Sequence, residues 1–492
     1  MRFFSTRGGA EAKNASEAIA KGIAEDGGLF VPERFPDLGG RLEEMLGMDY
    51  AERAALVLSQ YLEEYDYPAL LQACREAYAS FDEDAAPVVK LDEDLFILEL
   101  FHGPTLAFKD IALTLLPYLL RAGCDNAGIK EAVMILTATS GDTGKAALEG
   151  FKNKAGVKIM VFYPQDGVAE MQKLQMVTTE GNNVNVVAVE GNFDDCQTAV
   201  KKIFTDEDFK ARLKEKNTVF SSANSMNFGR LSPQIAYYFS AYLDLVNAEE
   251  IALGDEVDFV VPTGNFGDIL AGWYAKKMGL PVGKLICASN KNNVLSDFFS
   301  TGEYDVNREF YKTMSPSMDI LVSSNLERLI FELDGRDAAA TAQKMKSLSE
   351  TGKFTVTAAQ RARLSADFAA GFCDEDVCRE TIGNFFEEYD YVLDPHTAVA
   401  VGVYDGYACE NPVRPTVILS TASPYKFSQD VYFALTGKRE EDAFLAADKL
   451  EKMSAVPVPP QISALKEKNV RFAESAKKEE LGEIVLRFAE KK

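Results

Sequence analysis

From about residue 92 onward, short apolar segments alternate along the chain with longer amphipathic segments. The short segments are typical of buried strands and the longer ones of helices. Strands separated by helices of this length form βαβ crossovers, so the pattern predicts an α/β fold with parallel sheets. We expect strands at residues 96–101, 132–137, 157–163, 184–189, 257–261, 284–288 and 417–421, and helices at 143–153, 169–179, 194–204, 231–246 and 267–278.

The same pattern predicts two parallel-sheet lobes, with a cleft between them as the default binding site. A smaller α/β domain is expected at residues 131–215, and a larger one from residues 86–130 together with 216–440. Residues 1–85 are expected to form a mostly helical N-terminal region. Residues 441–492 are rich in lysine and glutamate and are expected to form a helical tail.

Composition excludes several classes of protein. The formal net charge is −24 over 492 residues, which opposes binding to nucleic acid. No stretch approaches the ~20 apolar residues of a membrane span, and the first residues lack a signal-type apolar run. Seven scattered cysteines without a Cys-x-x-Cys, and only two histidines, argue against a disulfide framework and a metal site. A soluble, cytoplasmic protein is expected.

The segment His102-Gly-Pro-Thr-Leu-Ala-Phe-Lys109-Asp110 places a lone lysine at the start of an apolar helix. Burial would lower the pKa of Lys109 and leave an amine nucleophile able to form a Schiff base. The alternative is a helix lysine whose stem lies along apolar surface while its ammonium group stays in solvent.

Two strand-to-helix loops have the composition of anion sites. In Thr137-Ala-Thr-Ser-Gly-Asp-Thr-Gly144, small residues leave backbone amides free at a helix N-terminus, although Ser140 or Asp142 could simply cap the helix. Thr139 stands where a P-loop needs glycine, so that motif is excluded. In Pro262-Thr-Gly-Asn-Phe-Gly-Asp-Ile-Leu-Ala-Gly272, the glycines permit close approach of a single phosphate, and a structural tight turn is the alternative.

A fourth segment, Leu419-Ser-Thr-Ala-Ser-Pro-Tyr-Lys-Phe427, ends the last strand at the edge where ligands bind in such folds. Together the four segments closely resemble the long form of threonine synthase, a fold-type-II pyridoxal-phosphate enzyme related to the tryptophan synthase β chain. The resemblance extends to Phe4-Ser-Thr-Arg-Gly and Asp26-Gly-Gly-Leu-Phe-Val-Pro, and is collinear from residue 1 to about 430. One departure is Ser423, where the family pattern has histidine.

The resemblance implies roles for a set of cofactor-binding residues. It makes Lys109 the Schiff-base lysine of pyridoxal 5'-phosphate, with Phe108 packed near the cofactor. Thr421 would hydrogen-bond the pyridine nitrogen. The cofactor phosphate would be held by the loop Gly264, Asn265, Phe266, Gly267 and Asp268, with Asp268 acting through its backbone amide.

The resemblance also implies a substrate site. The loop Ser140, Gly141, Asp142 and Thr143 would bind the α-carboxylate of the substrate, and Asn224, Ser225, Asn227 and Arg230 would line the cleft. Arg230 is the candidate for the substrate phosphate, because a guanidinium group matches phosphate bidentately. A surface ion pair is the alternative for Arg230.

The reaction implied is the conversion of O-phospho-L-homoserine and water to L-threonine and phosphate, with no metal. Two alternatives stay open at this point. One is another fold-type-II lyase, such as a serine/threonine dehydratase or a cysteate synthase. The other is a catalytically silent relative that binds pyridoxal phosphate or a phosphorylated amino acid. The sequence leaves the oligomeric state undetermined.

Overall fold

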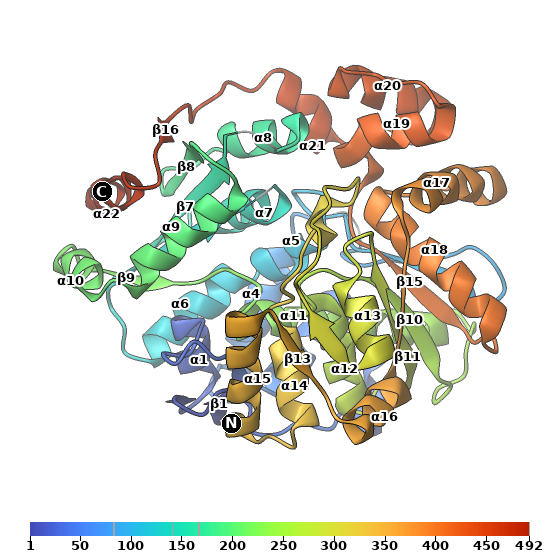
Figure 1. The fold of residues 1–492 in the computed structure, drawn as a ribbon, viewed down its shortest axis with the longest axis horizontal. Coiled ribbons are helices and arrows are strands. Elements are labelled where there is room, and N and C mark those ends of the chain that lie inside the picture. The colour runs from blue at the N-terminus through green and yellow to red at the C-terminus, as the bar shows by residue number, and fades with distance from the viewer. Residues whose placement is uncertain (82–83, 140, 166–167, 492) are drawn as a thin grey trace.

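The computed structural model describes residues 1–81, 84–139, 141–165 and 168–491, and over these residues the chain forms two lobes, each built on a sheet (Figure 1). The large lobe contains a six-stranded sheet in the order β14-β11-β10-β15-β5-β4, and the small lobe a five-stranded sheet in the order β16-β8-β7-β6-β9. Neighbouring strands are parallel, except that β4 runs antiparallel to β5. The predicted α/β class with two parallel-sheet lobes is therefore confirmed.

The strands of the large sheet are β4 (Val88–Lys90), β5 (Leu95–Glu99), β10 (Val257–Pro262), β11 (Val282–Ser289), β14 (Phe368–Phe372) and β15 (Thr416–Ser420). Those of the small sheet are β6 (Ala132–Ala138), β7 (Val157–Pro164), β8 (Val184–Val189), β9 (Thr218–Ser221) and β16 (Ser475–Ala476). Two small antiparallel sheets pair β1 (Phe3–Ser5) with β2 (Glu11–Ala12) and β3 (Phe30–Pro32), and β12 (Glu303–Asp305) with β13 (Lys353–Thr355).

The helices before residue 220 are α1 (Ala15–Lys21), α2 (Leu42–Met45), α3 (Tyr50–Ser59), α4 (Tyr67–Tyr78), α5 (Lys109–Leu113), α6 (Leu116–Asn126), α7 (Asp142–Phe151), α8 (Glu170–Val177), α9 (Phe193–Thr205) and α10 (Glu207–Glu215). Those after it are α11 (Phe228–Asn247), α12 (Gly267–Lys277), α13 (Val294–Thr301), α14 (Leu326–Leu333), α15 (Ala338–Thr351), α16 (Ala358–Asp367), α17 (Glu375–Tyr389), α18 (Pro395–Glu410), α19 (Ser428–Thr436), α20 (Ala443–Ser454), α21 (Pro460–Ser463) and α22 (Leu481–Glu490). Short 3₁₀ turns are η1 (Gly39–Arg41), η2 (Pro316–Met318), η3 (Pro424–Phe427) and η4 (Ala464–Lys466).

The strands and helices agree closely with the expected segments, and the differences are short strands that were not expected. The N-terminal region contains the β2-β1-β3 sheet in addition to its helices. β14 was not among the expected strands, and it pairs with β11 at the edge of the large sheet. The small sheet extends beyond residue 215 to include β9, and it takes β16 from the tail. Most of these unexpected strands have only two to four residues, too few to show a hydrophobic period, and the five residues of β14 include two alanines and a glycine in place of an apolar run.

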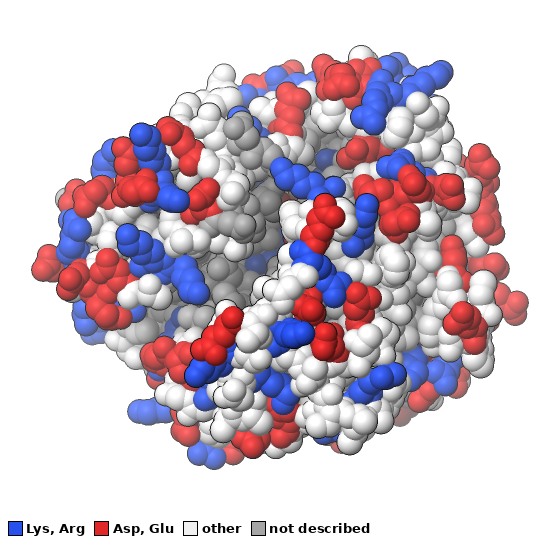
Figure 2. All heavy atoms as spheres, viewed as in Figure 1, with Lys and Arg blue, Asp and Glu red and all other residues white. Residues whose placement is uncertain are grey.

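Helices cover both faces of each sheet (Figure 1). In the large lobe, Val260 and Ile418 face α17 and α18, whereas Phe259 and Val417 face α11 and α12, as the alternation of side chains along a strand requires. In the small lobe, α9 and α22 lie against the face that carries Met134 and Met160. The surface is hollowed between the two lobes, and acidic and basic side chains are interspersed around the hollow (Figure 2).

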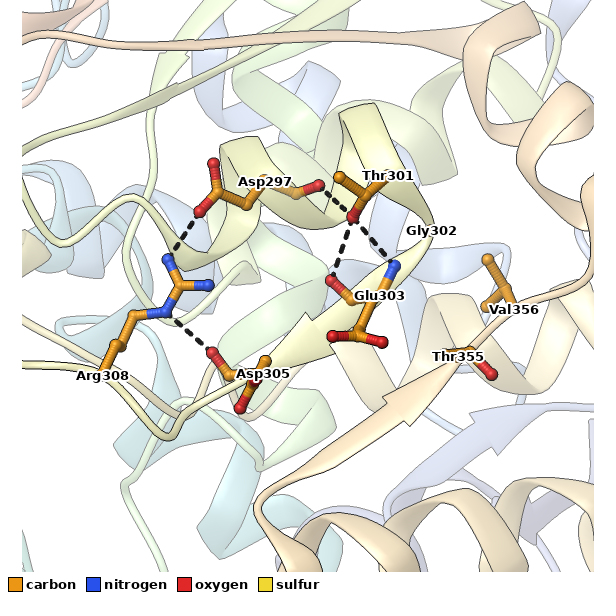
Figure 3. A pocket seen from close by; sticks show the side chains of 8 residues that line it. All are labelled: Asp297, Thr301, Gly302, Glu303, Asp305, Arg308, Thr355 and Val356. Carbon is orange, nitrogen blue, oxygen red and sulfur yellow. Dashed lines mark hydrogen bonds and ion pairs between the residues drawn. The ribbon is translucent and has the colours of Figure 1, made fainter.

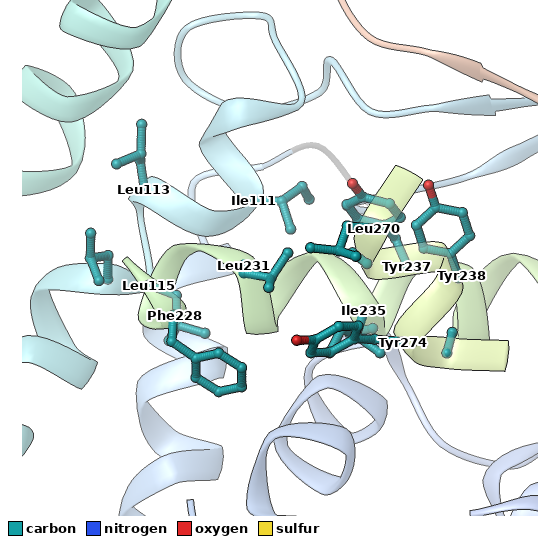
Figure 4. Close-up of a cluster of buried hydrophobic side chains, with 14 of the residues drawn as sticks. Ile111, Leu113, Leu115, Phe228, Leu231, Ile235, Tyr237, Tyr238, Leu270 and Tyr274 are labelled. Carbon is teal, nitrogen blue, oxygen red and sulfur yellow. The ribbon is translucent and has the colours of Figure 1, made fainter. Parts of the chain in front are cut away.

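The centre of the large lobe is α11, which is buried along most of its length. Leu231 and Ile235 of α11 lie among Ile111 of α5 and Leu270 and Tyr274 of α12 (Figure 4). Because α5 begins at Lys109, this apolar cluster fixes the position of the lysine backbone. No helix among the described residues has both the length and the apolar character needed to cross a bilayer.

The small lobe contacts the large one where α7 crosses α5. A Cβ atom on Gly150 of α7 would overlap the carbonyl oxygen of Leu113, a backbone atom that cannot rotate away. Gly150→Ala should therefore lower stability by about 1–3 kcal/mol, the usual cost of overpacking, seen as a lower thermal unfolding midpoint.

Gly406 of α18 is the matched control, since it is an exposed helical glycine with open space around its Cα. Gly406→Ala should leave the midpoint unchanged or raise it, by up to about 1 kcal/mol. Equal midpoints for Gly150→Ala and wild type would show that the two lobes do not meet at this crossing.

Candidate functional site

Lys109 lies at the junction between the lobes. Its segment is held against the end of β15, because Phe108 N donates to Thr421 O at 2.9 Å and Ser423 N donates to Leu106 O at 3.0 Å. The lysine side chain is 9 % exposed, and its Nζ lies 3.1 Å from Ser317 Oγ and 3.6 Å from Asp142 Oδ2. The alternative of a helix lysine with its ammonium group in solvent is therefore wrong.

Asp142, the first residue of α7, brings two lysines together. Its Oδ1 lies 2.8 Å from Nζ of Lys426 and accepts a hydrogen bond of 2.9 Å from Nε2 of Gln172, while Oδ2 faces Lys109. Lys426 also donates to Thr105 O at 2.7 Å. One buried carboxylate thus compensates two ammonium groups, and the site has an excess of positive charge.

In this arrangement the pKa values of Lys109 and Asp142 both lie below their ordinary values. Burial lowers the pKa of Lys109, the Asp142 carboxylate raises it, and the nearby Lys426 and Arg230 lower it further, so the net pKa of Lys109 lies below its ordinary value. Burial alone would raise the pKa of Asp142, but Lys426 and Lys109 hold that pKa well below its usual range. The result is a carboxylate that loses its proton at lower pH than usual, beside an amine that also loses its proton more readily.

The loop at Gly264 follows β10 and opens α12. Phe266 adopts a left-handed conformation (φ 63°), and its ring packs near Phe299 and Phe368. Ser323 Oγ donates to Gly264 O at 2.7 Å and Asn325 N donates to Asn265 O at 3.0 Å, so the loop carbonyls point toward the chain after η2. Within the described residues, the amides of Gly264, Asn265 and Phe266 make no hydrogen bond, and α12 has no side-chain cap. Free amides at a helix N-terminus form an anion site.

Asp268 lies in the first turn of α12 but directs its carboxylate toward α11. Its Oδ1 accepts hydrogen bonds from the Tyr237 hydroxyl at 2.5 Å and the Tyr238 hydroxyl at 2.8 Å. Its Oδ2 is buried without a partner among the described residues. Burial raises the pKa of Asp268 to about 6, although the two tyrosine hydrogen bonds oppose the shift.

Asp268 therefore predicts a pH dependence of stability. Its pKa is about 6 in the folded protein and ~3.9 in an unfolded chain, so the folded state binds the proton more tightly. Stability contributed by this group is full at low pH and falls as pH rises from ~4 to ~6. Asp268→Asn keeps an acceptor for both tyrosines and does not titrate. Relative to wild type, the variant should gain on the order of 2–3 kcal/mol between pH 4 and pH 7.

Thermal unfolding midpoints of the two proteins across this pH range measure the effect. Asp208→Asn, at an exposed aspartate of α10, is the matched control and should follow wild type at every pH. A constant difference between Asp268→Asn and wild type would contradict the burial-raised pKa.

Thr421 directly follows β15 and is buried, and its hydroxyl makes no hydrogen bond within the described part of the chain. Ser423 stands two residues further on, where the resembling family has histidine. Its hydroxyl accepts a hydrogen bond of 3.3 Å from Tyr425 N and so caps η3. The serine thus has a local structural role at the turn that carries Lys426.

The N-terminus of α7 is held by Thr139, a residue before the helix. Ser140 lies outside the described residues. Gly141 is the N-cap and offers no side chain, while Thr139 Oγ1 accepts hydrogen bonds of 3.0 Å from the amides of Gly141 and Gly144. Thr139 therefore satisfies two of the amides at this helix start, Asp142 does not act as the cap, and its carboxylate is left to bind the lysines. Thr143 follows it on the same turn and is half-buried.

In the segment from Asn224 to Arg230, some polar side chains are used inside the fold and others could still contact a ligand. Asn227 uses its whole amide inside the fold: Nδ2 donates to Ile19 O and Ser222 O, and Oδ1 accepts from Gly229 N. Asn224 and Ser225 are half-buried. Asn227 thus caps α11 and has no polar atom left for a ligand.

Arg230 is 6 % exposed, and its guanidinium donates to Ala223 O at 3.1 Å. No carboxylate among the described residues lies within ion-pair distance of it, so the alternative of a surface ion pair is wrong. Burial lowers the pKa of Arg230 to about 10. A buried, unpaired cation is costly, and an anion bound beside it would remove that cost.

Sequence reasoning missed the residues that support Lys109 from the other side. Ser317 of η2 accepts from Lys109, and its amide donates to His396 Nε2 at 3.2 Å. His396 Nδ1 in turn lies 2.7 Å from Asp394 Oδ1. Ser317 lies in a short 3₁₀ turn, and Asp394 and His396 lie at the start of α18. Of these residues, only His396, one of two histidines in the chain, is of a type unusual enough to have pointed to the site.

A cavity of about 520 Å³ lies elsewhere, at the end of α13 and between β12 and β13 (Figure 3). Arg308 on its wall is paired with Asp297 at 2.7 Å, and Thr301 donates to Asp297 O. None of the candidate residues lines it, so it is separate from the Lys109 site. Among the described residues, no cluster of three or more His, Cys, Asp or Glu could hold a metal ion.

Three family models match the chain in order. Residues 2–78 match the threonine synthase N terminus, residues 83–421 the pyridoxal-phosphate dependent enzymes, and residues 397–485 the threonine synthase C-terminal model. The chain is 42% identical to threonine synthase of Pseudomonas aeruginosa over 94% of its own length and 96% of that protein. The chain belongs to the threonine synthase family. Its fold is the α/β fold of the type-II pyridoxal-phosphate enzymes, as the resemblance implied.

Two solved threonine synthase structures and a human threonine synthase-like protein are also similar to the chain. The structure of a pyridoxal-phosphate-bound threonine synthase from Brucella melitensis superposes with a TM-score of 0.88 at 37% identity, covering 99% of both chains. The yeast threonine synthase structure gives 0.87 at 32% identity, covering 99% of this chain and 97% of that one. Human threonine synthase-like 1 is 44% identical over 86% of this chain, which spans 58% of the length of that relative.

Proposed function

We propose that the chain is a threonine synthase that converts O-phospho-L-homoserine and water to L-threonine and phosphate with pyridoxal 5'-phosphate as cofactor. The observation that carries the proposal is the buried Lys109 amine, held between Asp142 and Ser317 at the junction of the lobes. Membership of the threonine synthase family and the buried, unpaired Arg230 support the same reaction.

The residues present fit the cofactor. Lys109 supplies the amine for its aldehyde, with Phe108 beside it, where the lysine Nζ lies 4.9 Å from the ring centre. The amides of Gly264, Asn265 and Phe266, which are unpaired within the described residues, suit its phosphate, and the hydroxyl of Thr421 suits the pyridine nitrogen. When bound, pyridoxal phosphate supplies an electron sink for negative charge at the substrate Cα.

The chain's own groups would handle protons and charge. Lys109 Nζ, with its lowered pKa, would remove the proton from the substrate Cα and carry protons between Cα and Cβ. Asp142 and Ser317 would orient that amine through the contacts that they already make. The amides at the start of α7 would receive the α-carboxylate of the substrate, and Arg230 would bind its phosphate. Phosphate leaves from Cγ, and Cγ takes up a proton in place of the one lost from Cβ and becomes the methyl group. The hydroxyl of a water molecule then adds at Cβ, and Cα regains its proton.

We also propose a cytoplasmic location. All seven cysteines are free, and six of them are buried, which fits a reducing compartment. The borders of the expected domains stay a proposal, with the small domain extended to β9 and β16.

Lys109→Ala tests the assignment of the catalytic lysine. Borohydride reduction of wild type should fix the cofactor to the peptide that contains residue 109, and the variant should lose this label. Release of phosphate from O-phosphohomoserine should fall by at least ~10²–10⁴, because the general base is removed. Lys276→Ala is the control, since Lys276 pairs with Asp367 in the large lobe. Labelling of Lys145 or Lys426 in wild type would contradict the assignment, and so would release of ammonia in place of phosphate.

Arg230→Met tests the site for the substrate phosphate. Loss of a charge-assisted hydrogen bond should raise the KM for O-phosphohomoserine about ten- to hundredfold and weaken competitive inhibition by inorganic phosphate. Since Arg230 is a buried cation without a counter-ion, the thermal midpoint of the variant should be unchanged or higher. A lower midpoint with an unchanged KM would instead give Arg230 a purely structural role.

A further inference from the structure

The backbone of Ser317 is held by contacts from outside its own 3₁₀ turn. Its amide donates to His396 Nε2 at 3.2 Å. On the other side, a Cβ atom placed on Gly264 would lie only 2.6 Å from the Ser317 carbonyl oxygen, so the turn packs closely against the loop that follows β10. Together these contacts fix the point from which the Ser317 side chain starts.

The hydroxyl of Ser317 lies between two charged groups at the junction of the lobes. Its Oγ accepts from Lys109 Nζ at 3.1 Å and donates to Asp142 Oδ2 at 3.3 Å. A serine hydroxyl can do both at once, because it has one O–H group and two lone pairs. Both distances are at the long end of the hydrogen-bond range, so a shift of about 0.5 Å away from either group would break that contact.

Asp394 fixes the orientation and the tautomer of His396. The ring nitrogen Nδ1 lies 2.7 Å from Asp394 Oδ1, and the buried ring packs edge-on against Phe427 with 5.0 Å between the centroids. An amide N–H can only donate, so Nε2, which faces Ser317, carries no proton, and Nδ1 carries the proton that the carboxylate accepts. Because both ring nitrogens are occupied, the imidazole can act on Lys109 only through Ser317.

The same carboxylate is connected to the end of β15. Asp394 Oδ2 accepts a hydrogen bond from the hydroxyl of Thr397, whose Oγ1 lies 3.1 Å from Ser420 Oγ. Ser420 is the last residue of β15 and directly precedes Thr421. From one position at the start of α18, the carboxylate thus holds both the histidine and the strand end that carries Thr421.

We propose that His396 and Asp394 are positioning residues for Lys109. The imidazole holds the Ser317 amide, and the Ser317 hydroxyl is thereby kept beside the lysine amine while protons move between the substrate Cα and Cβ. This inference rests on the proposed function, because it concerns the base of that reaction. If Asp394 only capped α18, the contact between His396 and Ser317 would have no effect on the reaction, and the two cases predict different kinetics.

Two amide substitutions separate the two ring nitrogens. In His396→Gln the side-chain oxygen can reach the position of Nε2 and still accept from Ser317, whereas in His396→Asn the shorter amide stays near the position of Nδ1 and Asp394. His396→Asn should lower kcat for phosphate release about ten- to hundredfold with little change in KM, since a ~1 Å displacement at a reacting group can cost that much. His396→Gln should recover most of the loss. The visible circular dichroism of the bound cofactor, which reports the orientation of its ring, should change in His396→Asn and not in His396→Gln.

A second comparison separates positioning from helix capping. Asp394 and Asp374 each accept from the two amides that lie two and three residues ahead, at the starts of α18 and α17. Asparagine caps a helix about as well as aspartate. Asp394→Asn should nevertheless lower kcat, because one oxygen cannot serve the imidazole, the hydroxyl and both amides. Asp374→Asn is the matched control and should keep the kcat of wild type.

Ser317→Ala removes the hydroxyl and leaves the backbone contact in place. If His396 acts through this hydroxyl, the double variant Ser317→Ala/His396→Asn should be no slower than Ser317→Ala alone, whereas independent roles would multiply the two losses. Multiplied losses overturn the inference, and so does a His396→Gln variant as slow as His396→Asn, or an equal kcat for Asp394→Asn and Asp374→Asn.

If His396→Asn does not fold, Ser317→Ala and the two aspartate variants still decide, because a wild-type kcat in Ser317→Ala overturns the inference by itself. If wild type releases no phosphate from O-phosphohomoserine, the proposed function fails. The circular dichroism of the bound cofactor would then still show whether His396→Asn and Ser317→Ala disturb the same site in the same way.

Discussion

The Asp142 carboxylate is the interaction on which the arrangement of the site depends. It begins α7 of the small lobe and contacts Lys109 and Lys426, which belong to two separate segments of the large lobe. Because the three groups are buried, removal of the carboxylate would leave two uncompensated cations, at a typical cost of 3–5 kcal/mol. The contact therefore sets the spacing of the lobes and the protonation of the lysine together.

Much of the fold could be predicted because its signals are local. Strands such as β6 and β10 are long enough to show an unbroken apolar run, and helices such as α11 show their own period. β14 and β16 could not be predicted in the same way. Each is a short edge strand, and it is a strand only because β11 or β8 offers a free edge. Their identity is a property of the assembled sheet.

The residues of the candidate site also fall into two groups: those in local sequence motifs and those brought in by tertiary packing. Lys109 and the loop from Gly264 to Asp268 lie in contiguous motifs, so the sequence could single them out. The burial of Arg230 without a counter-ion and the capping role of Asn227 depend on neighbours such as Ala223 and Ile19. Ser317 contacts Lys109, although the two residues are 208 positions apart in the sequence. Tertiary packing alone brings it there.

The place of β15 in the large sheet has a consequence for synthesis of the protein. This strand lies between β5 and β10, yet it begins at Thr416, more than 150 residues after β10 ends. Ribosomes add ~5–20 residues per second, so β10 waits roughly 8–30 s with its inner edge unpaired, and β5 waits about twice as long. During that interval the nascent chain exposes two apolar strand edges that can pair with the wrong partner. Chaperone occupancy of the nascent chain should therefore be highest after β10 emerges, and should fall once β15 closes the sheet.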